Sequence, residues 1–519
     1  MDKQASVEAD RMRAAEVAMS LCLATDLGMG FPFQHGLSAT LTTMRLCEAL
    51  GTDPEATSQA YFASLLMYSG CTTDAANGSK TFRGGLTHKH THRQFGSSLE
   101  SFIGIAAALQ TPQASVLRRG YEIAVGLPAA ARFVNPHFTA MCEVAVMLSG
   151  KLALPESING IFNLLTERWD GKSILRRAAG DGVPLPLRII HVARDAAYQR
   201  LLGDDAHVIE VIASRSGHAF DPKVAKAFVD HAPELLAPTL SNELMWDAVL
   251  AAEPEPWLVL EGSEIDRALD AVGAFADLSS PYMAGHSMGV AQLASAAATL
   301  CGFPESEVRD VRRAGFIHDV GKASVNPTVW QKAGSLDADE WEQVRLHPYY
   351  TERVFSQSSF ARPVAAIACA HHERLDRSGY HRGIGAAELR KADRLLAAAS
   401  AFRNKTEPRP YREQHSPEQA AVILGEKARD GKLDTEMVSA VVEAAGQPAP
   451  KVERPAGLTE REVQVMRLVA RGLQTKQVAH ALGVAAKTAD HHIQNAYRKI
   501  GVSSRAAATL FAAENGLLN

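Results

Sequence analysis

The sequence lacks the features of membrane and secreted proteins. No apolar run approaches the roughly 18 residues that a membrane-spanning helix requires, and the charged N-terminus MDKQASVEADRMRAAE contains no hydrophobic signal segment. The six cysteines are scattered, without a CxxC pair, which argues against a disulfide framework or a zinc ribbon. We therefore expect a cytoplasmic protein that does not associate with membranes.

Aromatic residues are also scarce, at 6% of the 519 residues. Alanine-rich segments with apolar residues at every third or fourth position are frequent instead, and this pattern predicts helices. The chain is too long for one hydrophobic core, and its 46% hydrophobic and 22% charged residues are ordinary for globular proteins. We therefore expect an all-α protein with several domains.

Neither sign of charge dominates the chain, whose formal net charge is −4. From Gly457 to the end, however, eight Lys and Arg residues accompany four Asp and Glu residues, which leaves 46 basic and 54 acidic residues in the rest. A small basic region on a larger acidic body indicates that the C-terminal region makes any contact with nucleic acid.

Two irregular segments that contain prolines, residues 237–262 and 447–457, divide the chain into two large halves and a C-terminal module. The halves resemble each other in three segments that keep their order: 35–71 with 286–322, 167–195 with 373–401, and 220–229 with 433–442. Chance similarity between alanine-rich helices is the alternative. Because the order is kept, we favour an internal duplication.

The second half contains an ordered set of histidines with one carboxylate and one lysine. Its members are His286, His318, Asp319, Lys322, His347, His371 and His372. Imidazoles with a carboxylate suit Fe, Mn, Zn or Ni better than Mg or Ca. A single histidine is more often a core or surface residue, but several of these lie in apolar stretches such as IACAHHE, where a polar group without a partner is costly. The set therefore predicts a metal site.

Asp319 and its neighbours also suggest hydrolysis of a phosphate ester. We expect His318, Asp319 and Lys322 to share one helical segment, with Lys322 one turn after His318 on the same face. A lysine in that place could hold a phosphate beside a metal. A bound metal would lower the pKa of a water molecule to near neutrality and orient it for attack on phosphorus.

These residues lie in motifs that resemble the HD-GYP family of HD-domain metal phosphohydrolases. The motifs are GHS at 285–287, HDVGK at 318–322, HP at 347–348, HHERLDRSGY at 371–380 and RPYR at 409–412. The resemblance covers about 264–446 closely and 15–235 remotely. It implies a helical fold with two or three metals, hydrolysis of cyclic di-GMP, metal ligands at the six His and Asp positions, and catalytic roles for Asp319 and Lys322.

The second half departs from that family at several positions. Arg377 and His381 replace a glycine and the proline of the family's GYP loop, and Ser400 replaces a metal-binding aspartate. Asp393 lies two helical turns earlier, about 10 Å along the axis, so it cannot take over. Tyr282 falls where members with three metals carry a glutamate. We therefore expect a site with one ligand lost and without a third metal.

The first half has lost most of these ligands. His35 remains, but other residue types occupy the remaining positions: Met67, Tyr68, Cys71, Leu165, Thr166 and Arg194. We interpret it as a metal-free pseudo-domain. The segment HKHTH at 88–92 is either a metal-binding extended segment or, as we favour, a solvated loop.

The C-terminal module has the pattern of a helix-turn-helix. Thr459 and Glu462 form a capping box, a short helix ends at Gly483, and a second helix follows the turn. On that helix Ala489, Ile493, Ala496 and Ile500 form the buried stripe. A helical protein-interaction module is the alternative.

Residues 458–518 resemble the LuxR-type helix-turn-helix over their whole length, except that Ala485 stands where that family usually has a capping serine. We expect the opposite face of the second helix to meet base edges, and a further set to contact phosphates. The expected DNA-binding residues are Thr475, Lys476, Lys487, Thr488, Asp490, His491, Gln494, Arg498, Lys499 and Arg505.

Taken together, these observations predict a degenerate HD-type pseudo-domain at 15–236, a linker at 237–262, an HD-GYP-like domain at 263–446, a linker at 447–457 and a LuxR-type domain at 458–519. We favour a homodimeric transcriptional regulator that binds double-stranded DNA and whose HD-type body senses a ligand, forms the dimer, or does both. The alternative is a phosphodiesterase that depends on a divalent metal such as Fe or Mn. A cyclic dinucleotide or another phosphorylated small molecule is the expected ligand or substrate.

Overall fold

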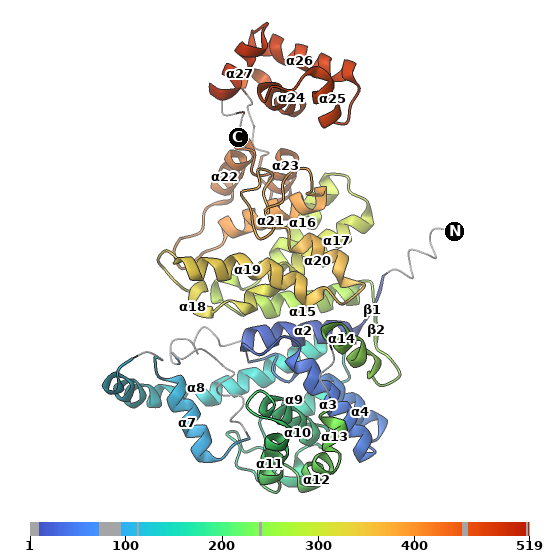
Figure 1. The fold of residues 1–519 in the computed structure, drawn as a ribbon, viewed down its shortest axis with the longest axis vertical. Coiled ribbons are helices and arrows are strands. Elements are labelled where there is room, and N and C mark those ends of the chain that lie inside the picture. The colour runs from blue at the N-terminus through green and yellow to red at the C-terminus, as the bar shows by residue number, and fades with distance from the viewer. Residues whose placement is uncertain are drawn as a thin grey trace. The chain divides into compact units, whose positions relative to one another are not determined.

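The protein is described by a computed structural model that covers residues 10–71, 82, 95–111, 114–237, 241–448, 455–514 and 517. Most of these residues are in helices (Figure 1). The only strands among them are β1 (Arg11–Arg13) and β2 (Val259–Glu261), which pair in antiparallel fashion with Met12 opposite Leu260. The prediction of an all-α fold is confirmed.

The first half consists of ten α-helices in the part of the chain that is described. They are α2 (Ala14–Met29), α3 (His35–Leu50), α4 (Pro54–Leu66), α7 (Ser98–Ala108), α8 (Val116–Lys151), α9 (Ser157–Phe162), α10 (Leu185–Gln199), α11 (Asp205–Arg215), α12 (Pro222–Asp230) and α13 (Ala232–Leu235). Apolar side chains of α3, α10, α11 and α12 form a hydrophobic core around Phe220 and Phe228.

The second half repeats this arrangement after α14 (Asn242–Ala251). Its helices are α15 (Ser263–Asp277), α16 (His286–Leu300), α17 (Glu305–Ile317), α18 (Pro327–Trp330), α19 (Ala338–Phe355), α20 (Ala361–Ala368), α21 (Lys391–Thr406), α22 (Pro417–Arg429) and α23 (Thr435–Ala444), with short 3-10 turns at η2 (Pro281–Met283) and η3 (Val320–Ser324). Four C-terminal helices follow: α24 (Glu460–Ala470), α25 (Thr475–Ala481), α26 (Ala486–Ile500) and α27 (Arg505–Glu514).

Equivalent contacts in the two halves support the predicted duplication. The Asp26 carboxylate accepts a hydrogen bond from the Gly36 N–H at 2.9 Å, and the Asp277 carboxylate accepts one from the Ser287 N–H at 3.0 Å. Both pairs stand at the start of equivalent helices, α3 and α16. Near the end of each half, an arginine and the aspartate that caps the last matched helix form ion pairs: Arg188 with Asp221 at 2.6 Å, and Arg394 with Asp434 at 3.1 Å.

The segment 237–262, expected to be an irregular linker, contains α14 and β2 in its described part. Trp246 and Val249 of α14 are buried, and the Tyr61 hydroxyl donates to the Val249 carbonyl at 3.0 Å. The apolar face of α14 therefore packs on the first half. The prolines that suggested a linker at 254 and 256 lie between α14 and β2, where they interrupt neither element.

The described chain divides into two compact units that interleave along the sequence. One unit comprises Met1–Gln292, Val308–Cys369 and Glu407–Gln414, and the other comprises Leu293–Glu307, Ala370–Thr406 and His415–Asn519. Within the first unit, α2 of the first half packs against α15 and η3 of the second half. The Arg353 guanidinium lies 4.1 Å from the ring centre of Phe33, which adds a cation–π contact between the halves.

None of the described helices is both long enough and apolar enough to cross a membrane.

Candidate metal centre

The HDVGK motif forms a tight turn that leads from the end of α17 into η3. Helix α17 ends at Ile317, so the expectation that His318, Asp319 and Lys322 share one helical segment is wrong. The turn forms because the Gly321 N–H donates to the Thr351 hydroxyl at 2.9 Å, while that hydroxyl donates to the His318 carbonyl at 3.1 Å. A Cβ on Gly321 would lie 1.9 Å from the His347 carbonyl oxygen, so this approach to α19 requires glycine.

Three histidines direct a ring nitrogen at the Asp319 carboxylate. His286 Nε2 and His318 Nε2 lie 3.4 and 3.2 Å from Asp319 Oδ2, and His347 Nε2 lies 3.3 Å from Asp319 Oδ1. All four side chains are buried. The residues come from the start of α16, the end of α17 and the middle of α19, so the fold brings together four of the six predicted ligands around one carboxylate.

Backbone carbonyls fix the tautomer of two of these rings. His318 Nδ1 lies 2.8 Å from the Gly315 carbonyl, and His347 Nδ1 lies 2.6 Å from the Val344 carbonyl. Because a carbonyl oxygen only accepts, each Nδ1 must carry the proton, and Nε2 of the neutral ring then presents a lone pair. With the rings neutral, these lone pairs face carboxylate oxygens, an arrangement that suits a cation between them.

The spacing of these atoms is suited to a metal ion. Ligands bound at about 2.1 Å to one ion lie about 3.0–3.4 Å apart when the angles are octahedral or tetrahedral. The distances from Asp319 to the three histidines lie in or at the edge of this range. The Nδ1 hydrogen bonds are those that histidines bound to metals make through their other nitrogen. The potential ligands fall into two groups, His286 with His318 and Asp319 and His347 with His371 and His372. Such donor sets, rich in imidazole nitrogen, favour a transition metal over Mg or Ca.

The surroundings favour the ligand forms of Asp319 and His347. Burial raises the pKa of Asp319, but the neighbouring His318 and Lys322 lower it further, so that it falls well below its usual range. Burial lowers the pKa of His347. Burial lowers the pKa of His286 as well, but hydrogen bonds to the Asp319 and Glu407 carboxylates raise it above its usual range. Lys322 is buried and donates to Asp319 Oδ2, and its ammonium lies 5.3 Å from the ring centre of Trp330. The lysine therefore places a positive charge next to the candidate ligands, as predicted.

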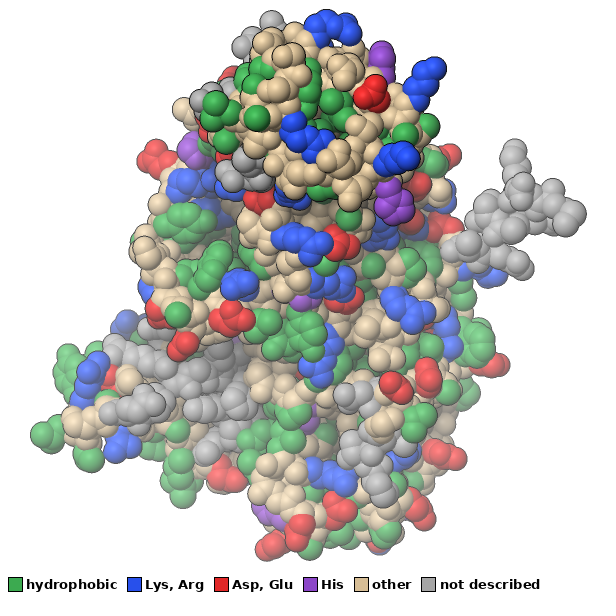
Figure 2. Space-filling view, turned by 45° about the horizontal axis from the view of Figure 1, so that its top comes forward, with side chains coloured by type: hydrophobic (Ala, Val, Ile, Leu, Met, Phe, Trp, Pro, Cys, Tyr) green, Lys and Arg blue, Asp and Glu red, His purple; other side chains and the backbone are tan. Residues whose placement is uncertain are grey.

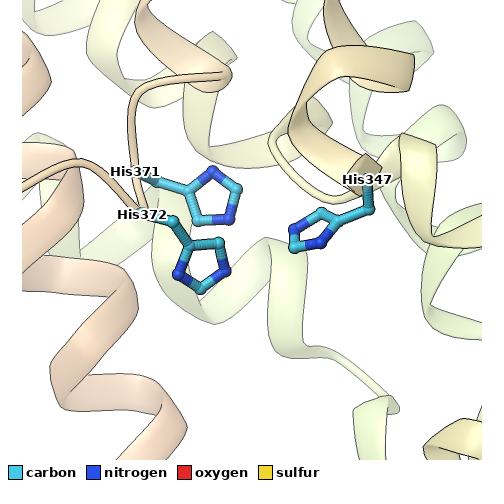
Figure 3. A group of neighbouring side chains, drawn as sticks. All are labelled: His347, His371 and His372. Atoms are coloured by element: carbon cyan, nitrogen blue, oxygen red, sulfur yellow. The ribbon is translucent and has the colours of Figure 1, made fainter. Parts of the chain in front are cut away.

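His371 and His372, from the HHE motif, form a further group of potential ligands. Nitrogens of His347, His371 and His372 lie within 4.8 Å of one another (Figure 3). The His372 ring stacks on Tyr380 of the following loop at 4.5 Å. The loop is closed by Glu373, which accepts from the N–H groups of Arg382 and Ile384 at 2.8 and 3.1 Å. Both histidines remain candidate ligands.

The departures from the family pattern have structural counterparts. Arg377 has φ of 66° where the equivalent Gly171 of the first half has 67°, so an arginine occupies a left-handed conformation that favours glycine. Asp393 is engaged by Arg390, whose Nη2 and backbone N–H donate to it at 2.7 and 2.8 Å. Asp393 therefore caps the start of α21. This role agrees with the expectation that it does not replace the ligand lost at Ser400.

Glu407 is a residue of the site that the sequence analysis missed. Its Oε2 lies 2.6 Å from His286 Nδ1. The signal available in the sequence was an acidic residue two positions before the RPYR motif, but its role depends on a contact across 121 residues.

At the equivalent site of the first half, side chains that include an arginine and two tyrosines line a small cavity. Arg194 is buried, donates to the Ser64 carbonyl, and lies 5.0 Å from the ring centre of Tyr68. His35 stacks on Phe31 at 4.3 Å, and burial lowers its pKa to about 3. Within the described part of this half, no three potential ligands lie together. The segment 88–92 lies outside the described residues.

The C-terminal helices form the expected helix-turn-helix. Thr459 and Glu462 make the capping box, and Gly483 ends the α25 turn in a left-handed conformation. Ala489, Ile493 and Ala496 of α26 are buried against α24 and α25. Basic side chains are visible over this part of the chain in the space-filling view (Figure 2).

The predicted DNA-binding residues are mostly accessible. Exposed members are Lys476, Lys487, Thr488, Asp490, His491, Gln494, Arg498 and Lys499, whereas Thr475 and Arg505 are partly buried. Lys499 also donates to Glu462 Oε2 at 2.7 Å and to the Gly457 carbonyl at 3.1 Å. This lysine therefore holds α26 to the start of α24 in addition to any contact with phosphate. Ala485 caps α26 without a side-chain hydrogen bond.

Comparisons with known proteins identify the same two regions, the one with the candidate ligands and the helix-turn-helix. Residues 271–437 match the family model described as HD domain, and residues 456–512 match the model for bacterial regulatory proteins of the luxR family. The chain is 26% identical to the 3'3'-cGAMP-specific phosphodiesterase 3 of Vibrio cholerae serotype O1, over 85% of this chain and 96% of that protein.

Two further relatives match a shorter part. The 3'3'-cGAMP-specific phosphodiesterase 1 of V. cholerae is 31% identical over 33% of this chain and 40% of its own length. A cyclic di-GMP phosphodiesterase of Thermotoga maritima is 32% identical over 26% of this chain and 37% of its own length. The chain therefore spans about two fifths of these two proteins.

The fold of this chain is similar to that of a solved structure. A crystal structure of a cyclic GMP-AMP specific phosphodiesterase of V. cholerae superimposes with a TM-score of 0.58 at 23% identity, covering 84% of this chain and 98% of the other. The chain thus combines an HD domain with a C-terminal helix-turn-helix domain of the luxR family.

Proposed function

We propose that the HD domain is a metal-dependent phosphodiesterase that acts on a cyclic dinucleotide, and that the C-terminal domain binds double-stranded DNA. The observation that carries the first part is the convergence of His286, His318 and His347 on Asp319 beside Lys322. The phosphodiesterase is the alternative interpretation of the sequence. This geometry supports metal binding, and Lys322 beside the candidate ligands supports phosphate chemistry.

Each residue of the site has a role in this proposal. His286, His318 and Asp319, and beside them His347 with His371 and His372, would hold divalent transition metal. When bound, the metal supplies an acidified water molecule and an electrophile for phosphorus chemistry. Asp319 stays ionised because His318 and Lys322 offset the cost of its burial. Lys322 offers an ammonium group to a phosphate oxygen, where it would offset the negative charge of the phosphodiester.

The substrate class is suggested by the relatives. Three of them are named for hydrolysis of 3'3'-cGAMP or cyclic di-GMP, and one aligns over 96% of its length. The test is to incubate the purified full-length chain, loaded with Mn²⁺ or Fe²⁺, with each cyclic dinucleotide and to quantify linear product. We expect product that disappears with a chelator and in Asp319→Asn.

Ser400 favours a second candidate function. The resemblance places a metal-binding aspartate at this position, and a serine hydroxyl is a poorer ligand for a cation. In that case the domain would bind metal and a cyclic dinucleotide without hydrolysing it and would act as a ligand sensor. Binding of a cyclic dinucleotide at a defined stoichiometry, without linear product over several hours, would select this candidate over the enzyme.

The proposal for DNA rests on α26. Its buried stripe leaves Lys487, Gln494 and Arg498 on the exposed face, which suits insertion into a major groove. Two copies of a helix-turn-helix read paired half-sites, so we propose a homodimer on DNA. The test is a selection of bound sequences from a random duplex library with the full-length chain and with residues 1–446. We expect enrichment of a symmetric site with the full-length chain alone.

A further inference from the structure

Helix α16 begins with His286, and this ring has a different partner from the other two histidines of the site. His318 and His347 direct Nδ1 at neutral backbone carbonyls, whereas His286 directs Nδ1 at the Glu407 carboxylate at 2.6 Å. Both groups are shielded, since His286 is 1% exposed and the Glu407 side chain 13%. An ionised acceptor makes the stronger hydrogen bond, and water competes little here.

Glu407 is itself held in place by Arg409. The Arg409 guanidinium donates to Glu407 Oε2 at 3.0 Å and to the Tyr282 carbonyl at 2.9 Å. Arg409 and Arg412 exchange backbone hydrogen bonds at 2.8 and 3.0 Å, which fold residues 409–412 into a tight turn. The carboxylate is therefore fixed to the segment that immediately precedes His286.

We infer that Glu407 is a positioning residue for the metal centre: it fixes the His286 ring with the proton on Nδ1, so that the Nε2 lone pair faces Asp319. This inference rests on the proposed metal-dependent function. A carboxylate on the far nitrogen of a ligating histidine orients the ring and makes its other nitrogen a better donor to a metal. Glu407 would thereby supply a negative charge to a site in which Ser400 has replaced an aspartate ligand.

The competing explanation is that Glu407 only pairs with Arg409 to hold the turn. Under that explanation Glu407→Gln lowers the thermal stability of the protein without metal and leaves metal affinity unchanged. Under our inference the same substitution, which keeps the shape of the side chain and removes its charge, weakens metal binding. The two explanations therefore differ in a readout that does not depend on hydrolysis.

The experiment is a titration of the full-length chain, stripped of metal, with Mn²⁺ in competition with a chelating dye. The proteins are the wild type, Glu407→Gln, His286→Ala and Glu413→Gln. Glu413 is exposed, and its substitution makes the same change of charge six residues away, so it is the matched control. We expect Glu407→Gln to weaken Mn²⁺ binding about 10–100-fold. Glu413→Gln should bind Mn²⁺ with the affinity of the wild type, and His286→Ala should bind it more weakly than Glu407→Gln.

Equal affinities of wild type, Glu407→Gln and Glu413→Gln would overturn the inference and leave the metal site intact. A wild type that binds no Mn²⁺ would overturn the inference together with the proposed function. If Glu407→Gln does not fold, Glu407→Asp takes its place. This variant keeps the charge but shortens the side chain by one methylene, so an intermediate loss of affinity is expected, and an unchanged affinity would again overturn the inference.

Discussion

Ser400 is the residue whose substitution bears most directly on whether the site can turn over a substrate. The resemblance assigns a metal-binding aspartate to its position, and it is buried in α21. We expect Ser400→Asp to raise metal occupancy and the rate of phosphodiester hydrolysis, by about 10-fold or more if a ligand is restored. Metal analysis of the purified protein and an assay of linear product measure both effects.

Ser400→Ala is the control for this prediction, because it removes the hydroxyl without adding a carboxylate. It should leave occupancy and rate near those of the wild type. If Ser400→Asp lowers metal occupancy, the serine is itself part of a working site, and the lost ligand is not what limits turnover.

Asp26 provides a prediction for pH dependence in the first half. Burial raises its pKa from 3.8 to about 7, although the Gly36 N–H and Arg194 oppose the shift. The folded state therefore holds the proton more tightly than the unfolded state. The stabilisation is fully present below about pH 4 and is lost as the pH rises to about 7, at up to about 1.4 kcal/mol per pH unit.

Asp26→Asn should remove this dependence while keeping an oxygen that accepts from Gly36. The measurement is the difference in free energy of unfolding between wild type and variant at pH 4, 5.5 and 7, taken from denaturant titrations of the full-length chain. The difference should shift in favour of the variant with rising pH. A difference that does not change over this range would show that Asp26 is ionised when folded.

At the scale of the element, α3 and α16 begin with equivalent histidines in different surroundings. His286 directs Nε2 at Asp319, whereas His35 stacks on Phe31 near a buried arginine. We expect His286→Ala to lower metal stoichiometry and His35→Ala to leave it unchanged in the full-length chain. The measurement is the number of metal ions bound per chain in each variant. A lower number in His35→Ala would show that the pseudo-domain also binds a metal.

Helix α26 carries the prediction for DNA. Gln494 lies on its exposed face, and a polar contact with a base edge contributes about 1–3 kcal/mol. Gln494→Ala should therefore weaken binding to the selected site by that amount and relax its sequence preference. The matched control is Gln464→Ala on α24, outside the recognition helix. Equal effects of both substitutions in a fluorescence titration would argue against a base contact by Gln494.

The sequence predicts the helical elements and the ligand motifs well, because both depend on local spacing. The apolar stripe of α26 and the capping box of Thr459 are examples. Where contacts between distant segments determine the local structure or the role of a residue, the sequence gives a wrong prediction or none. The His318–Lys322 segment is a turn because of Thr351, α14 forms because Trp246 is buried, and Glu407 belongs to the site through His286.

At the scale of the whole molecule, the first half packs against the candidate metal site. Helix α2 packs against η3, the turn that carries Lys322, within one compact unit. In the first half the buried guanidinium of Arg194 provides a positive charge without a metal. We therefore propose that the two halves have separate roles: the second keeps the candidate ligands, and the first is a packed support for the turn that presents them.

The central claim is that the HD domain hydrolyses a cyclic dinucleotide with a metal held at Asp319. The most direct measurement is the turnover of 3'3'-cGAMP and cyclic di-GMP by the full-length chain loaded with Mn²⁺, beside Asp319→Asn and Asp393→Asn. Asp393 is engaged by Arg390 away from the proposed ligands, so its substitution controls for the loss of a buried carboxylate. The account predicts linear product from the wild type and Asp393→Asn and at least 100-fold less from Asp319→Asn, on the order of a lost ligand. Equal rates in all three proteins, or no product from any of them with metal bound, would contradict it.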